Sequence, residues 1–130
     1  MKNNVITALK SLRPNSQWTI YGDLDTIDSY DSIEWGSSNS TSAPSKAEIQ
    51  AELTRLDNAE PMKLLRDQRN TLLNESDWTR LDDNGLSSDK KAEWSTYRQA
   101  LRDLPSSADP KLDEIYELIQ SSVTWPSKPS

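Results

Sequence analysis

The chain has 21 Asp and Glu residues but no His and no Cys, so the usual general base, the commonest metal ligand and the cysteine nucleophile are all missing. A catalytic site would need a carboxylate pair, a Ser-Lys pair or a carboxylate metal cage. Asp23, Asp25 and Asp28 follow Gly22 and suggest calcium, but they lack the ligand order and the late Glu of an EF-hand. We therefore expect a solvated acidic loop here, with no metal and no cofactor.

Other functional classes are excluded by glycine spacing and charge. Gly22, Gly36 and Gly85 are far apart, which rules out a glycine-rich phosphate-binding loop. Fifteen Lys and Arg residues against 21 acidic residues give a net charge of -6, which disfavours nucleic acid and anionic membrane as partners. No apolar run approaches the roughly 18 residues of a membrane span. These features favour a protein that binds other proteins and is not an enzyme.

The elements that must position any binding residues begin with a small N-terminal sheet. Residues 17–21 are rich in β-formers, and residues 30–35 repeat the alternation, so we predict an antiparallel pair that turns at Gly22. Residues 5–12 are compatible with a short helix before it. This β-hairpin region spans residues 1–36, and the Ser-rich residues 37–44 are predicted to be a linker.

A long helix is predicted to begin at Ser45, because Glu48 three positions later completes a capping box. An apolar stripe continues to about Leu73. Pro61 interrupts this stripe and predicts a kink or a fresh helix start, since proline removes a hydrogen bond inside a helix. The first half of the helical region is therefore one kinked helix or two consecutive helices.

A second amphipathic helix is predicted from Ser87 or Ser88 to about Leu104. Residues 74–84 would form a structured connector before it, anchored by two apolar side chains. We expect the two helices to pair through Trp and Leu faces, within a helical module of residues 45–105. In the C-terminal segment, 106–130, the apolar spacing favours a helix over a strand at residues 111–120, and residues 123–126 look extended. The expected fold class is α+β.

The aromatic and arginine side chains of these helices allow two interpretations. Trp94 and Tyr97 share one helical face, where such rings are more often core than binding site. Arg98 and Arg102 follow them at one-turn intervals and could stack on aromatic rings or pair with acidic residues. The alternative for these arginines, and for Arg66 and Arg69, is a solvated helix face.

Three runs of residues, taken together, resemble the signature of the phage tail assembly chaperone family. They are an arginine-rich helix over residues 65–73, the Ser-Asp-Trp-Thr run at 76–79, and a Trp-x-x-Tyr-Arg-x-x-Leu-Arg helix within residues 94–105. A Val-Thr-Trp-Pro element at 123–126 completes the pattern. The resemblance covers about residues 64–126, and similar modules occur at the ends of tail-fibre and other virion proteins.

The resemblance implies a protein that assists assembly of a phage tail or tail fibre by protein–protein binding, in the host cytoplasm. The main alternative is a structural subunit retained in the mature particle, in the tail, fibre or baseplate region. Phage tail or tail-fibre proteins are the expected partners, and a homo-oligomer within an assembly is possible. The candidate partner-binding residues are Arg66, Arg69, Trp78, Trp94, Tyr97, Arg98, Arg102 and Trp125.

Overall fold

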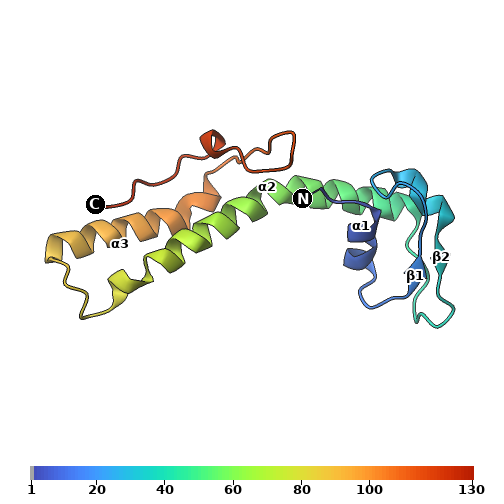
Figure 1. The fold of residues 1–130 in the computed structure, drawn as a ribbon, viewed down its shortest axis with the longest axis horizontal. Helices are drawn as coiled ribbons and strands as arrows, with labels where there is room; N and C mark the ends of the chain where they lie inside the picture. The colour runs from blue at the N-terminus through green and yellow to red at the C-terminus, as the bar shows by residue number, and fades with distance from the viewer. Residues whose placement is uncertain (1) are drawn as a thin grey trace. The chain divides into compact units, whose positions relative to one another are not determined.

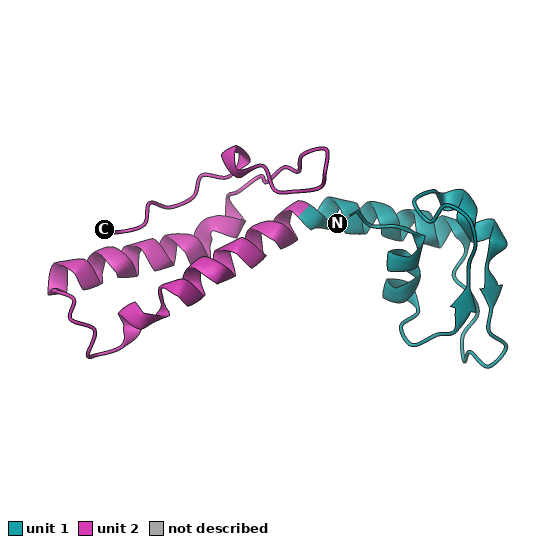
Figure 2. Ribbon diagram, viewed as in Figure 1, with its two compact units in different colours: residues 1–60 teal, residues 61–130 magenta. Residues whose placement is uncertain are grey.

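The computed structural model describes residues 2–130 and divides the chain into two compact units, residues 1–60 (unit 1) and residues 61–130 (unit 2; Figure 2). A small two-stranded antiparallel sheet precedes a mainly helical region, which confirms the predicted α+β class (Figure 1). The α-helices and strands are α1 (Val5–Leu12), β1 (Trp18–Thr19), β2 (Glu34–Trp35), α2 (Lys46–Glu75) and α3 (Ser88–Asp103).

Helix α1 has the predicted bounds and is started by its own side chains. Asn4 accepts a hydrogen bond from the backbone N–H of Thr7 at 3.2 Å, and the Thr7 hydroxyl accepts one from the backbone of Asn4 at 3.4 Å. This capping box pairs two donors that would otherwise lack partners. The helix buries Val5 and Leu9 in one apolar cluster with Ile49 of α2. The core of unit 1 therefore lies between α1 and the first half of α2.

The sheet pairs Trp18 with Trp35, but both strands are shorter than predicted. Residues Ile27–Ser32 form a 3-10 helix, η1, where the sequence predicted the start of the second strand. The Ser29 and Ser32 hydroxyls donate to the carbonyls of Thr26 and Ser29, at 3.0 and 2.7 Å. Such local side-chain bonds to the backbone compete with sheet pairing, which explains the wrong prediction at residues 30–33.

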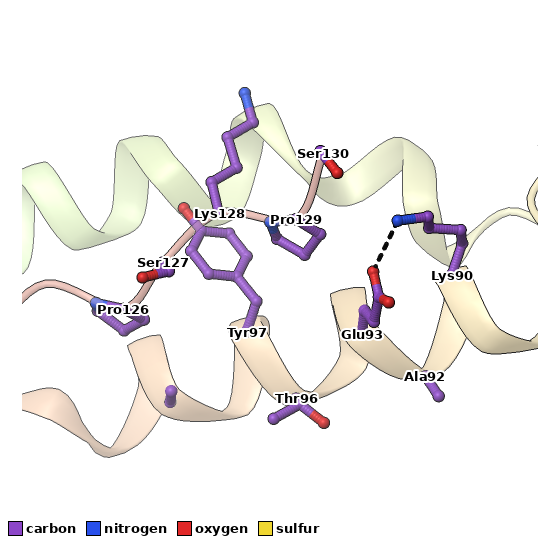
Figure 3. A pocket seen from close by; sticks show the side chains of 11 residues that line it. Lys90, Ala92, Glu93, Thr96, Tyr97, Pro126, Ser127, Lys128, Pro129 and Ser130 are labelled. Atoms are coloured by element: carbon purple, nitrogen blue, oxygen red, sulfur yellow. Dashed lines mark hydrogen bonds and ion pairs between the residues drawn. The ribbon is translucent and has the colours of Figure 1, made fainter.

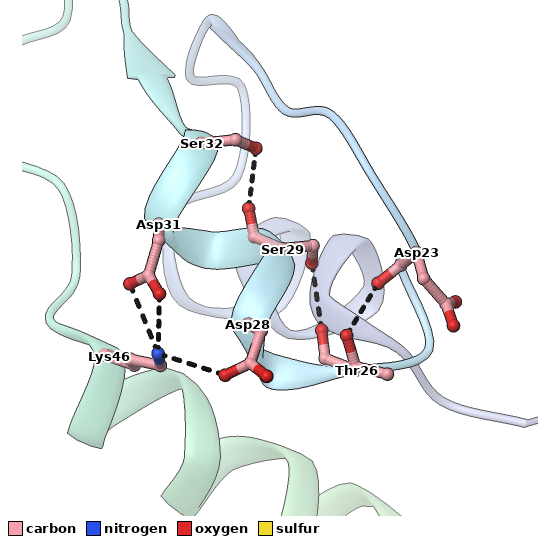
Figure 4. A network of polar contacts seen from close by, with 7 residues as sticks. All are labelled: Asp23, Thr26, Asp28, Ser29, Asp31, Ser32 and Lys46. Atoms are coloured by element: carbon pink, nitrogen blue, oxygen red, sulfur yellow. Dashed lines mark hydrogen bonds and ion pairs between the residues drawn. The ribbon is translucent and has the colours of Figure 1, made fainter.

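The acidic loop before β2 is attached to α2 (Figure 4). The ammonium group of Lys46 pairs with Asp31 at 3.0 Å and with Asp28 at 3.5 Å. The hydrogen bond from Asp31 raises the pKa of Lys46. Within residues 2–130, no group of three or more acidic side chains is arranged to hold a metal ion. Asp28 and Asp31 therefore pair with a cation of this chain.

The Ser-rich residues 37–44 are bonded to the rest of unit 1. Asn39 bonds both backbone groups of Gln17, at 2.8 and 2.7 Å, and the indole N–H of Trp35 donates to the Thr41 carbonyl at 2.9 Å. Pro44 is fully buried, and its carbonyl accepts a hydrogen bond from the Tyr30 hydroxyl. These bonds hold the segment across the end of the two-stranded sheet. The predicted boundaries of the N-terminal region, the linker, the helical module and the C-terminal segment, at residues 36, 44 and 105, stay a prediction.

Helix α2 begins with the predicted capping box. The Glu48 backbone N–H donates to the Ser45 hydroxyl at 3.1 Å, and the Glu48 carboxylate accepts from the Ser45 backbone at 2.7 Å. The helix continues through Pro61 to Glu75, so the predicted alternative of a fresh start is wrong. Proline deprives the Asp57 carbonyl of its usual donor. Asp57 is exposed, so water can supply the missing hydrogen bond.

The carboxylate of Glu52 in α2 makes the stability of unit 1 depend on pH. Its carboxylate is 8% exposed and accepts hydrogen bonds from Arg55 at 2.6 Å and from Ser11 of α1 at 2.6 Å. Arg55, and then Ser11, lower the pKa of Glu52 from 4.5 to about 2. Because the pKa is lower in the folded state, this group stabilises the fold above about pH 4.5, and the stabilisation is lost as the pH falls towards 2.

We expect Glu52→Gln to flatten the fall in unit 1 stability over this acidic range. Urea unfolding at several pH values, followed by the NMR signals of the Trp18 and Trp35 indole N–H groups in the otherwise unmodified chain, measures it. If the stability of the Glu52→Gln protein fell as steeply with pH as that of the unmodified chain, the pH dependence could not be assigned to Glu52.

In unit 2, α3 is capped by Ser87, whose hydroxyl accepts from the Lys90 backbone at 3.2 Å, and its bounds match the prediction. A 3-10 helix, η2 (Asp77–Arg80), lies in the connector between α2 and α3. After α3 come two more 3-10 helices, η3 (Leu104–Ser106) and η4 (Gln120–Ser122). The backbone of Val123 is extended, as predicted, and residues 124–126 form neither helix nor strand.

The predicted helix at residues 111–120 is wrong. Leu112 and Leu118 form an antiparallel bridge, and the chain between them makes a turn. The Asp113 carboxylate accepts from the backbone N–H groups of Ile115 and Glu117, both at 2.9 Å. An aspartate that captures nearby backbone donors favours a turn over a helix. Leu118 then packs inward on the unit 2 core and Ile115 remains outside.

Candidate functional site

Unit 2 is built around a pair of helical segments, the second half of α2 and α3, covered on one side by the C-terminal segment. One apolar cluster contains Leu65, Leu104 and Val123, and a second contains Trp94, Tyr97 and Leu101. Trp125 packs against both clusters. The C-terminal segment therefore completes the core of this unit.

Arg98 of α3 reaches the C-terminal end of α2 and is only 9% exposed. Its guanidinium donates to the Leu73 carbonyl at 2.7 Å, to the Ser76 hydroxyl at 2.6 Å and to the Asp77 carboxylate at 2.9 Å. The last carbonyls of a helix lack donors within the helix, and a positive charge is favourable there. Arg98 thus acts as a C-terminal cap of α2 and ties the connector to α3.

Three aromatic rings form a chain from the interior of unit 2 to its surface. Trp94 and Tyr97, both 6% exposed, meet edge to face with ring centres 5.7 Å apart. Trp94 meets Trp78 of the connector in the same manner at 5.5 Å. Trp78 is 44% exposed. Burial, and secondly the charge of Glu75, raise the pKa of the Tyr97 hydroxyl. Trp94 and Tyr97 are therefore core residues, and the exposed ring of Trp78 packs on the buried ring of Trp94.

The eight residues proposed from the sequence occupy different depths. Trp94, Tyr97 and Arg98 are buried. Trp125 and Arg69 are half-buried, and Arg69 donates weakly to the Arg102 carbonyl at 3.5 Å. Arg66, Trp78 and Arg102 are exposed, and Arg102 bonds to the side chain of Gln99 on its own helix at 2.8 Å. The structure thus brings Trp78, Trp94, Tyr97 and Arg98 together, and these four residues link the connector to α3.

A shallow groove of about 740 Å³ separates α3 from the last residues of the chain (Figure 3). Tyr97 stands in the groove between Pro126 and Pro129, and Lys128 points away from α3. Lys90 and Glu93 pair at one end at 3.0 Å. The groove is thus partly filled by the chain's own C-terminal segment.

Sequence reasoning missed one group of surface residues. Ile115 is 70% exposed, Tyr116 is 37% exposed and Ile119 is 36% exposed, all in the turn that replaces the predicted helix. If this segment were a helix, its apolar residues would share one face and point towards the core. The signal that could have located the turn is Asp113, two residues before Ile115, because aspartate commonly starts such turns. Large apolar side chains therefore lie outside the core at both the connector and this turn.

The model of one protein family, described as phage tail assembly chaperone protein, matches residues 62–130. That range covers more than half of the chain and nearly coincides with unit 2. The chain belongs to this family. The resemblance inferred from the Arg, Trp and Tyr runs is thereby confirmed, and with it a role in phage tail assembly. No curated protein and no solved structure matches the chain.

Family membership places the Arg98 network and the aromatic chain in the part of the protein that the family shares. Unit 1, with its sheet and acidic loop, lies outside the matched residues. None of the helices in the described residues has the length and apolarity needed to cross a membrane.

Proposed function

We propose that this chain assists phage tail assembly by binding a tail or tail-fibre protein transiently in the host cytoplasm, without catalysis. The observation that carries the proposal is the surface of the family-matched unit. Unit 2 packs its interior with Leu, Val and Trp side chains, yet it exposes other large apolar side chains. Exposed apolar groups that gather on a surface are typical of binding sites. In unit 2 they form two groups, Trp78 and Leu81 in the connector and Ile115, Tyr116 and Ile119 in the turn that follows Leu112.

The connector supports this proposal because its exposed ring is rigidly held. Trp78 rests on Trp94, and the adjoining Thr79 is buried. Asp77, the residue before Trp78, is bonded to Arg98. A side chain that is ordered before binding loses less entropy when a partner covers it. We include Trp78 and the exposed arginines Arg66 and Arg102 among the residues that contact the partner.

The absence of catalysis is proposed from the available side chains. The chain has no His or Cys, and the pKa of the Glu52 carboxylate is lowered to about 2. That carboxylate is occupied by Arg55 and Ser11, where it joins α1 to α2. It is a structural group.

The test combines binding with particle composition. The full chain is titrated against each purified tail and tail-fibre protein of its phage by isothermal calorimetry, and purified particles are analysed by quantitative mass spectrometry. We expect a complex with at least one of these proteins and no stoichiometric copy of the chain in particles. Stoichiometric presence in particles would support a structural subunit instead, and failure to bind any of these proteins would reject the proposed function.

A further inference from the structure

We infer that the turn at residues 112–119 is a docking surface for a basic segment of the partner that carries large apolar side chains. This inference rests on the proposed function, since it specifies one contact surface of the same partner. It concerns a part of unit 2 that contains none of the candidate residues predicted from the sequence. Three features of the turn carry it, namely a fixed base, an exposed apolar tip and uncompensated negative charge.

The base of the turn is fixed by hydrogen bonds on both sides. The Ile119 N–H donates to the Lys111 carbonyl at 2.8 Å, and the Lys111 N–H donates to the Ser122 hydroxyl at 2.9 Å. The side-chain amides of Gln68 in α2 and Gln120 bond to each other twice, both at 2.8 Å. Leu118 packs into the core. The turn is thus ordered before any partner arrives, which lowers the entropic cost of binding.

The tip of the turn presents apolar side chains that the fold leaves uncovered. Ile115 is 70% exposed, and Tyr116 and Ile119 are each more than one-third exposed. Tyr116 has a φ of 62°, in the left-handed region that glycine and asparagine occupy far more readily. A large side chain held in this conformation at the surface does not help the turn to form. Recognition of a partner gives a physical reason for a tyrosine at this position.

The negative charge around the tip of the turn favours a partner with basic side chains. Lys111 is paired with Asp109 at 3.0 Å, so it does not neutralise the tip. Glu114 and Glu117 are exposed, and neither forms an ion pair with another residue in the range 2–130. Lys or Arg side chains of a partner would complement these carboxylates. A second copy of this chain would bring the same negative face, and the net charge of -6 opposes such a contact.

The inference is tested with the full chain and the tail or tail-fibre protein that binds it in the calorimetric titration. We expect Ile115→Ser combined with Ile119→Ser to weaken binding about tenfold or more, as for apolar contacts at the centre of an interface. We expect Glu114→Lys combined with Glu117→Lys to weaken binding and to reduce its dependence on salt. Tyr21→Ser is the matched control, because Tyr21 is 56% exposed in unit 1 beside an acidic loop, and it should change the dissociation constant less than twofold.

Each outcome decides between the two proposals. All these changes are at exposed positions, so far-UV circular dichroism and thermal melting should match the unmodified chain; if the double serine variant alone unfolds, Ile115→Ser replaces it. Unchanged binding by a folded turn variant overturns the docking surface and leaves the proposed function intact. An equal loss in Tyr21→Ser, or salt-independent binding by the unmodified chain, also overturns the inference. If the unmodified chain binds no tail or tail-fibre protein, the proposed function fails and this inference fails with it.

Discussion

Trp94→Ala is expected to lower the free energy of unfolding of unit 2 by about 3 to 5 kcal/mol, the range for removing a buried aromatic ring and leaving a cavity. The ring is 6% exposed and packs in one cluster with Tyr97 and Leu101. It also supports Trp78 through an edge contact, which the substitution removes. Urea unfolding followed by far-UV circular dichroism measures the loss.

Trp78→Ala is the matched control for Trp94→Ala, since it removes the same ring chemistry from the other side of the contact. Trp78 is 44% exposed, so its removal leaves little cavity and should cost about 0.5 to 1.5 kcal/mol, the value of an aromatic pair beyond burial. A small loss of stability in Trp94→Ala accompanied by loss of partner binding would instead identify Trp94 as a contact residue. Similar losses in the two variants would contradict the buried role assigned to Trp94.

Arg98→Met is expected to destabilise unit 2 by about 1.5 to 3 kcal/mol, because hydrogen bonds to a charged group contribute about that much and the bond to Ser76 is buried. Methionine keeps an apolar stem of similar length, so the change tests the guanidinium rather than packing. The Leu73 carbonyl and the Ser76 hydroxyl lose their shared donor. Hydrogen exchange should also show earlier opening at the C-terminal end of α2.

Arg102→Met provides the control, because Arg102 is one helical turn further along α3 but exposed, with its side chain bonded to Gln99 of the same helix. It should change the free energy of unfolding by less than about 0.5 kcal/mol, as surface substitutions usually do. If Arg98→Met is as mild as Arg102→Met, the capping of α2 by Arg98 contributes little. Arg98 would then become a candidate residue for contact with the partner protein.

The sequence by itself determined the features that depend on neighbours along the chain. The capping box at Ser45 and the amphipathic stripe of α3 are local patterns, and each predicted its element correctly. The Arg, Trp and Tyr runs likewise identified the family, because their order and spacing are properties of the sequence. Local hydrogen bonding and helical periodicity depend on residues a few positions apart, so the sequence predicts them without knowledge of the fold.

The tertiary structure alone decided where Arg98 and the apolar residues of 111–120 lie. The sequence left Arg98 either paired with a neighbouring group or on a solvated helix face; it is buried, and it donates to a carbonyl at the end of α2. The apolar spacing of residues 111–120 suggested a helix, but Asp113 binds backbone N–H groups and Leu118 packs on the core with Leu65. The contacts of Arg98 with Leu73 and of Leu118 with Leu65 join residues far apart in the chain, so no local pattern predicts them. For that reason Ile115 lies at the surface, in a turn that the sequence pattern did not predict.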